Sequence, residues 1–165
     1  MTNNYYKNCI NCVSMAGKRP TAYASIKGSK QYSNLRGNVY FYQTEMGVMV
    51  VAEIFGLPNP TNPCQSPVFG FHIHEGKSCT GNEADPFADA MTHYNPQNCP
   101  HPYHAGDLPP LFGNQGYAFS MFLTDRFTTQ EVIGKTVIIH DKPDDFTTQP
   151  SGNSGSKIAC GVIQR

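Results

Sequence analysis

Residues 70–107 read GFHIHEGKSCTGNEADPFADAMTHYNPQNCPHPYHAGD and contain five of the six histidines of this 165-residue chain. The sixth, His140, closes an apolar run that begins at Thr136. No histidine lies before residue 72 or after residue 140, a clustering that scattered surface histidines would not show. Imidazole is the commonest metal-ligating side chain and suits copper and zinc. The segment therefore predicts a metal centre.

Two groups of ligands can be counted in this region. His101, His104 and Asp107 recur at intervals of three residues, and with one more histidine they would form a shell of three nitrogens and one oxygen. Zinc favours such a tetrahedral shell.

His72 and His74 alternate in a strand-like run, so both would project from the same face and could converge on a second ion. His140 would supply a third nitrogen to that ion. Two four-coordinate ions need eight ligand positions, and these residues offer seven side chains. The count closes if His93 is shared, with one ring nitrogen facing each ion.

Five segments resemble the copper–zinc superoxide dismutase family in the same order and at compatible spacings, and the chain is identified as a bacterial member of it. The segments are 70–75 (GFHIHE), 93–96 (HYNP), 104–108 (HAGDL), 134–140 (GKTVIIH) and 152–162 (GNSGSKIACGV). The resemblance extends over roughly residues 20–163.

The resemblance implies the same partition of ligands as the counting. It assigns copper to His72, His74, His93 and His140, and it assigns zinc to His93, His101, His104 and Asp107. Metal-bound histidines normally donate their other N–H to an acceptor, and the resemblance gives this role, for His72 and His101, to Asp144. It also implies a disulfide between Cys79 and Cys160.

The implied activity is the dismutation of superoxide, with the superoxide anion as substrate. Copper would cycle between Cu(II) and Cu(I), converting one superoxide to oxygen and a second, with two protons, to hydrogen peroxide. His93 would be catalytic, because its nitrogen facing copper can let go of the reduced ion and take up a proton. The alternative is a non-enzymatic copper- and zinc-binding or metal-delivery protein of the same fold. Relatives of that kind typically lose a copper ligand, and this chain loses none.

Lys157 departs from the family pattern, which places a catalytic arginine three residues before the last conserved cysteine. A cation beside copper raises the local concentration of a small anion. Lysine keeps the charge but lacks the planar fork of arginine. We therefore expect Lys157 to serve catalysis, with an activity below the usual level of the family.

The chain has six cysteines. Cys64 and Cys99 flank the ligand segment on both sides, and we predict that they form a second disulfide. Cys9 and Cys12 form a lone CxxC motif, for which a redox or metal role, a local disulfide and free thiols all stay open. The N-terminus lacks the apolar region of a secretory signal. The compartment is therefore taken as cytoplasmic by default, with an extracytoplasmic location possible given the cysteines.

Length and composition indicate one domain, residues 20–165, preceded by a polar extension over residues 1–19. The charges balance at 12 basic and 12 acidic residues, so no basic stripe indicates nucleic acid. No apolar run approaches the roughly 20 residues that span a bilayer. A homodimer is possible, since members of the family pair through different surfaces.

Short alternating runs and 28 glycines and prolines in total predict an all-β fold without helices. The expected strands are 22–26, 38–43, 48–55, 68–74, 116–124, 135–140 and 157–163. Residues 75–114 and 141–156 are expected to form a long metal-binding loop and a second, short functional loop. The resemblance implies an antiparallel Greek-key barrel or immunoglobulin-like sandwich, since copper–zinc superoxide dismutases are themselves among the known sandwich proteins.

Overall fold

The computed structural model describes residues 19–62, 64–65 and 67–165, and nearly all regular structure in them is strand. The strands are β1 (Ala22–Gly28), β2 (Arg36–Thr44), β3 (Gly47–Phe55), β4 (Val68–Phe69), β5 (Phe71–His74), β6 (Leu111–Phe112), β7 (Tyr117–Thr124), β8 (Thr136–His140) and β9 (Lys157–Gln164). The helices are single short turns, η1 (Lys30–Tyr32), η2 (Ala88–Ala90) and α2 (Thr129–Val132). The predicted all-β class is confirmed.

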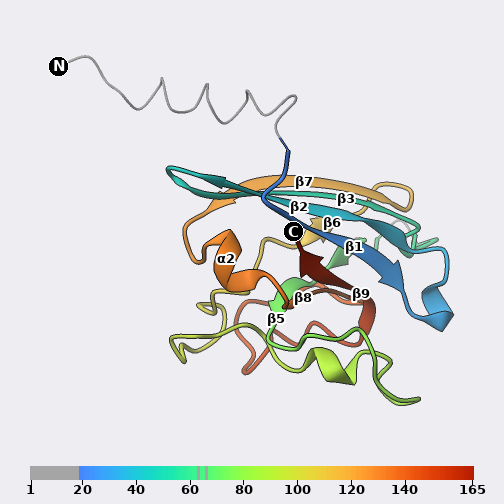
Figure 1. The fold of residues 1–165 in the computed structure, drawn as a ribbon. Coiled ribbons are helices and arrows are strands. Elements are labelled where there is room, and N and C mark those ends of the chain that lie inside the picture. Colours follow the sequence, from blue (N-terminus) through green and yellow to red (C-terminus); the bar gives the residue numbers. More distant parts are fainter. Residues whose placement is uncertain (1–18, 63, 66) are drawn as a thin grey trace.

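Seven strands form one curled antiparallel sheet in the order β5-β8-β9-β1-β2-β3-β7, and β4 and β6 form a separate pair. Figure 1 shows β2, β3 and β7 as an upper layer and β5, β8 and β9 as a lower layer, joined through β1. The last strand returns beside the first. The chain crosses to the lower layer after β3, back to the upper layer before β7, and to the lower layer again after β7. This is the crossing pattern expected of a Greek-key barrel or sandwich.

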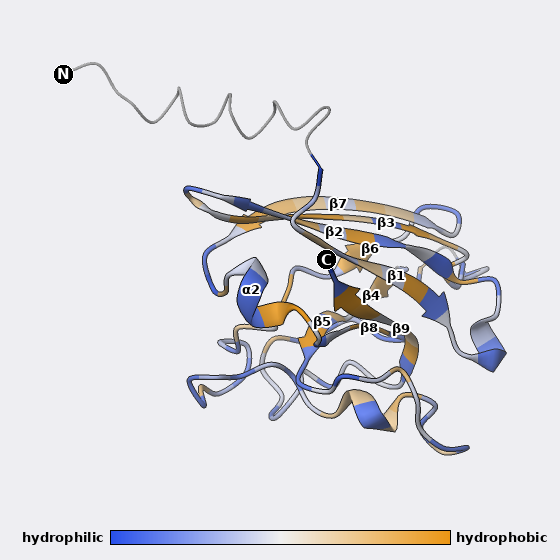
Figure 2. Ribbon diagram, viewed as in Figure 1, coloured by the Kyte–Doolittle hydropathy of each residue, from blue (hydrophilic) through white to orange (hydrophobic). Residues whose placement is uncertain are grey.

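The core lies between the two layers, where the buried apolar side chains pack together. Figure 2 shows the apolar stretches of these strands in orange. Alternation along β5 sends Phe71 and Ile73 into this core, where both are fully buried. Its two histidines therefore project from the opposite, outer face of the lower layer. The two long loops, 75–110 and 141–156, lie beneath that face (Figure 1), so the histidines are sheltered although they are outside the barrel.

The predicted strand over residues 68–74 is interrupted at Gly70. Its N–H donates to the Lys142 carbonyl at 2.7 Å, and its carbonyl accepts from the His140 N–H at 2.8 Å. A Cβ at this position would lie 2.8 Å from the Ser154 side chain, so the close approach of these segments requires glycine. The break separates β4 from β5 and brings His140 beside β5.

Helix α2 was not expected from the sequence. It is a single turn that begins after Thr128, whose backbone N–H donates to the Glu131 carboxylate at 2.6 Å in a capping box. The Thr-x-x-Glu spacing at residues 128–131 is the sequence signature of this cap. A four-residue helix is too short to show the 3.6-residue periodicity by which helices are recognised. The two-residue strand β6, inside the predicted long loop, was missed because it is too short to show the alternation by which strands are recognised.

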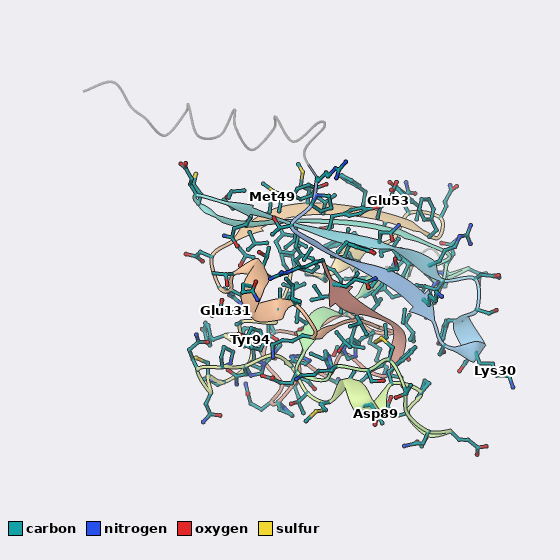
Figure 3. All side chains as sticks on the ribbon, viewed as in Figure 1. Lys30, Met49, Glu53, Asp89, Tyr94 and Glu131 are labelled. Atoms are coloured by element: carbon teal, nitrogen blue, oxygen red, sulfur yellow. A yellow bond between two sulfur atoms is a disulfide. The ribbon has the colours of Figure 1, made fainter. Side chains whose placement is uncertain are left out.

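The Cys79–Cys160 disulfide is confirmed and joins the long loop to β9, 81 residues later in the chain. Figure 3 draws it as a yellow bond, and its label for Asp89 marks the same loop beneath the sheet. Around the disulfide a small apolar cluster packs Phe87 and Ala90 of the loop against Ile138 of β8. The loop is therefore attached to the lower layer by a covalent bond and by buried apolar surface.

The predicted second disulfide is wrong, because Cys64 and Cys99 are both free cysteines in the structure. Each is held by its own local turn. The Cys64 N–H donates to Asn62 Oδ1 at 2.9 Å, and Cys99 exchanges two hydrogen bonds with the Asn95 side chain. Flanking positions in sequence were not sufficient to bring the two thiols together.

Residues 1–18 lie outside the described residues, so the predicted extension and the pair Cys9 and Cys12 remain expectations. In the part of the chain that the structure describes, no helix has the length and apolar character needed to cross a membrane.

Removing the disulfide tests its contribution to stability. A Cys79→Ser/Cys160→Ser double variant should lose roughly 4 kcal/mol of unfolding free energy, because the bond closes a loop of about 80 residues in the unfolded chain. Urea unfolding of the metal-free protein measures this loss. Cys64→Ser is the matched control, since this exposed free cysteine should change stability by less than about 0.5 kcal/mol. A double variant as stable as the control would contradict the assignment.

Candidate metal centre

Four histidines meet at the outer face of the lower layer. His72 and His74 come from β5, His140 ends the neighbouring strand β8, and His93 comes from the long loop. An isolated β-bridge pairs His74 with His93 and so fastens the loop to the strand. One ring nitrogen of each histidine lies within 4.8 Å of those of the other three, and all four residues are buried. We call this set the first cluster.

A second cluster consists of His93, His101, His104 and Asp107, whose ligand atoms also lie within 4.8 Å of one another. Asp107 reaches His93 Nδ1 with Oδ1 at 2.7 Å and His101 Nδ1 with Oδ2 at 3.0 Å. A backbone bridge between His72 and Asp107 places this cluster beside the first. The structure thus brings together both predicted ligand sets, and His93 belongs to each of them.

Asp144 lies between the two clusters and accepts a hydrogen bond from each. His72 Nε2 donates to its Oδ2 at 2.7 Å, and His101 Nε2 donates to its Oδ1 at 2.9 Å. These bonds place the protons on the Nε2 atoms, so the Nδ1 atoms carry the lone pairs that a metal requires. The position predicted for Asp144 is the one that the structure shows.

Backbone carbonyls orient two further histidines of the first cluster. His74 Nδ1 donates to the Met91 carbonyl at 2.8 Å, and His140 Nδ1 donates to the Gly155 carbonyl at 3.2 Å. Their Nε2 atoms are left 3.4 Å from each other, facing the interior of the cluster. Outward N–H groups are therefore satisfied by protein acceptors, while inward nitrogens are free to act as ligands.

Three inward nitrogens are buried and have no hydrogen-bond partner: His72 Nδ1, His93 Nε2 and His101 Nδ1. His101 Nδ1 is close to Asp107 Oδ2, but the two atoms are not aligned as a hydrogen bond. Unpaired buried polar atoms are rare in folded proteins because their desolvation is unfavourable. A pair of metal ions would satisfy all three atoms, and nitrogens with one carboxylate suit copper and zinc. The residues present therefore fit these two metals.

Burial keeps three histidines of the first cluster, His72, His74 and His140, neutral. Desolvation lowers the pKa of His72 to about 4 and the pKa of His140 to about 3, and it holds the pKa of His74 well below the ordinary value. Repulsion between neighbouring imidazoles acts in the same direction. Neutral imidazole is the form that binds metal, so at pH 7 these side chains need not lose a proton to become ligands.

The two carboxylates stay ionised. Burial alone would raise the pKa of Asp144, but hydrogen bonds from His72, the Phe146 N–H and His101 outweigh it and leave the pKa well below its usual range. The pKa of Asp107 is also lowered, because the hydrogen bond from His93 and the surrounding imidazoles outweigh desolvation. Gly152, at φ +66°, packs against this arrangement, since a Cβ there would overlap Asp144 Oδ1. The second loop is thus shaped around the Asp144 carboxylate.

Three residues that support the centre were not singled out from the sequence. Arg126 Nη1 donates to the carbonyls of Pro102, His104 and Asp107 at 3.2–3.3 Å. The Gln149 amide pairs with the backbone N–H and carbonyl of His101 at 2.9 and 2.7 Å. Asp85 pairs with Lys157, the predicted cation of the site.

A cavity of about 620 Å³ opens beside the first cluster and is lined by His74, His93, His140 and Lys157, among others. Lys157 begins β9, and its side chain is only 15% exposed. Its Nζ donates to Asp85 Oδ2 at 2.6 Å and to the Phe87 carbonyl at 3.2 Å. The structure therefore places the predicted cation at this cavity, already engaged by a carboxylate.

The lowered histidine pKa values predict an acid-sensitive metal-free protein. His72 and His140 titrate near 4 and 3 when folded and near 6.5 when unfolded. Between these values the unfolded state binds more protons, so their contribution to stability is complete above about pH 6.5 and is lost as the pH falls toward the folded values. His72 alone represents on the order of 3 kcal/mol.

Urea unfolding of the metal-free protein between pH 7.5 and 4.5 measures this loss. A His140→Gln variant is the control and should show a shallower decline, because it has one titrating group fewer. A wild-type stability that is constant or rises toward pH 4.5 would contradict the neutral, buried state of these histidines.

Comparisons with known proteins agree with this geometry. The model of the copper/zinc superoxide dismutase family matches residues 35–163. The copper–zinc superoxide dismutase of Deinococcus radiodurans is 32% identical over 152 residues, covering 81% of this chain and 80% of that protein. The enzyme of Legionella pneumophila is 35% identical over 136 residues, covering 78% and 77%. An enzyme of Drosophila melanogaster described as extracellular is 32% identical over 162 residues, covering 86% and 83%. Two clusters sharing one histidine, with these relatives over most of the length, show that the chain belongs to the copper/zinc superoxide dismutase family.

Proposed function

We propose that the shared-histidine centre dismutates superoxide, with copper held by the first cluster and zinc by the second. The net reaction consumes two superoxide anions and two protons and yields one oxygen and one hydrogen peroxide. Copper supplies the one-electron chemistry by alternating between Cu(II) and Cu(I), while zinc, which has no redox chemistry, contributes only charge and orientation. The observation that carries this proposal is the set of three unpaired buried nitrogens facing the interiors of the two clusters.

His93 has the geometry of a proton carrier. Its Nδ1 faces Asp107, and its Nε2 is buried without a partner on the side of the first cluster. When Nε2 is not engaged as a ligand, it can hold a proton and pass it to departing peroxide. The Asp107 contact and the stacking of His93 on His72, with ring centroids 3.9 Å apart, keep the ring from turning away. We therefore assign His93 a catalytic role.

Lys157 serves as the cation that attracts superoxide into the cavity. A positive charge beside a concave site raises the local concentration of a small anion. The lysine lacks the planar fork of the arginine found in the family, and its ammonium already binds Asp85 at 2.6 Å. Both features support a dismutase activity below the usual level of the family. All four residues of the first cluster are in place, which favours the enzyme over the alternative of a metal-delivery protein.

The direct test is a superoxide-consumption assay on protein loaded with both metals, with metal content measured in parallel. We expect one copper and one zinc per chain and catalytic superoxide loss. His140→Ala should lower copper content and abolish activity while zinc content is kept, because His140 belongs only to the first cluster. Lys142→Ala, an exposed residue of the same loop, is the control and should keep both metals. Full copper occupancy with no more activity than the metal-free protein would overturn the proposal.

Lys157→Arg should raise the dismutation rate constant several-fold at low ionic strength, because the guanidinium can bond an acceptor and an anion at once. Lys157→Gln is the matched neutral variant and should lower the rate about tenfold by removing the charge. Stopped-flow decay of superoxide measures both. A rate for Lys157→Arg equal to or below that of the wild type would contradict this role of residue 157.

A further inference from the structure

The charges around the cavity are few. Among the described residues, Lys157 is the one lysine or arginine that lines it, and its acidic lining residues are Glu75 and Asp85. Glu75 is paired with Lys135 at 2.9 Å. Asp85 is paired with Lys157 at 2.6 Å. The single cation available to an incoming anion is therefore matched by a carboxylate in the same cavity.

Asp85 is held in position by its own loop. Its Oδ1 accepts the Phe87 N–H at 3.0 Å, which leaves Oδ2 directed at Lys157, and its backbone N–H donates to Asn82 Oδ1 at 3.0 Å. Lys157 Nζ also donates to the Phe87 carbonyl. The ammonium is thus bound on one side by two oxygens of the same short segment. That segment is anchored through Phe87 in the apolar cluster beside the disulfide.

We propose that Asp85 sets how strongly the centre attracts anions by cancelling most of the field of Lys157. This inference rests on the proposed function, and it adds a residue that acts on the substrate through Lys157. Asp85 is therefore a positioning residue rather than a catalytic one. A small anion approaching the cavity meets a fixed ion pair instead of an isolated ammonium, and the interaction of an anion with such a dipole falls off faster with distance than its interaction with a charge.

The loop also offers the ammonium an acceptor that does not depend on the charge of Asp85, the Phe87 carbonyl. In an Asp85→Asn variant the side chain is nearly isosteric. Its single amide oxygen replaces one of the two carboxylate oxygens that accept from Lys157 Nζ and from the Phe87 N–H, and the Phe87 carbonyl remains as an acceptor for Nζ. The variant removes the negative charge, while the Phe87 carbonyl still accepts from the ammonium. The electrostatic role of Asp85 can therefore be separated from its structural role.

The experiment compares Asp85→Asn with Glu83→Gln in copper- and zinc-loaded protein. Glu83 is exposed on the same loop and does not line this cavity, so both variants change the net charge equally. Two quantities are measured over a range of ionic strength: the superoxide rate constant by stopped flow, and the dissociation constant of azide, a small anion, from the absorption of the bound copper.

Asp85→Asn should raise the rate constant roughly two- to fivefold at low ionic strength and tighten azide binding by a similar factor. Both gains should shrink at high salt because ions screen the unmasked charge. Glu83→Gln should behave as the wild type. Because the fields of separate charges add, Asp85→Asn should also raise the rate constant and the azide affinity in a Lys157→Gln background, from lower starting values.

Unchanged azide affinity and an unchanged salt dependence in Asp85→Asn would overturn the proposal, as would an equal effect of Glu83→Gln. A lower rate with no change in salt dependence would show that Asp85 only stabilises the loop, and would also overturn it. Failure of the proposed function can be told apart from failure of this inference. If the copper-loaded wild type has no dismutase activity, the azide dissociation constants of the variants still test whether Asp85 weakens the attraction of anions.

Discussion

The imidazole of His93 belongs to both clusters, and this sharing constrains the rest of the molecule. Its two ring nitrogens face in opposite directions, so the first cluster on β5 and β8 must lie one imidazole width from the second cluster in the long loop. Two antiparallel backbone bridges, His74 with His93 and His72 with Asp107, set that separation. A loop that shifted by a few ångströms would keep each ligand in the sequence but would lose the common one.

Several unrelated interactions hold the loop in this register. The Cys79–Cys160 disulfide and the cluster around Phe87 attach its first part to the sheet. Arg126 donates hydrogen bonds to three carbonyls in the last part of the loop. Asp144, from the second loop, accepts a hydrogen bond from a histidine of each cluster. Apart from the single turn η2, neither loop has regular structure of its own, so their order depends on these contacts and on the metal ions that the unpaired nitrogens would bind.

The same arrangement produces the chemistry. Burial keeps His72, His74 and His140 neutral. Outward hydrogen bonds orient the rings, and the unpaired nitrogens face the interiors of the two clusters. The cavity leaves one side of the first cluster open to a small anion. Lys157 and Asp85 both line this opening. The loop that the disulfide attaches to the sheet therefore also places the Asp85 carboxylate at the cavity.

Some features could be predicted because their signal is local. The alternation of Phe71, His72, Ile73 and His74 indicates a strand with ligands on one face and core on the other. The spacing of His101, His104 and Asp107 indicates a second set in the same way. Other features lack a local signal or have a weak one. Helix α2 is a single turn, and the capping pair Thr128 and Glu131 is its only mark.

The sequence by itself determined the all-β class, the seven candidate ligand residues and their division into two sets, because residue type, alternation and spacing are properties of short segments. The resemblance to the family supplied the disulfide and the role of Asp144. Only the tertiary structure decided that Cys64 and Cys99 remain free, that Arg126 and Gln149 hold the loop, and that Asp85 neutralises Lys157. These contacts join residues up to 72 positions apart, and which distant groups meet depends on the packing of the whole chain.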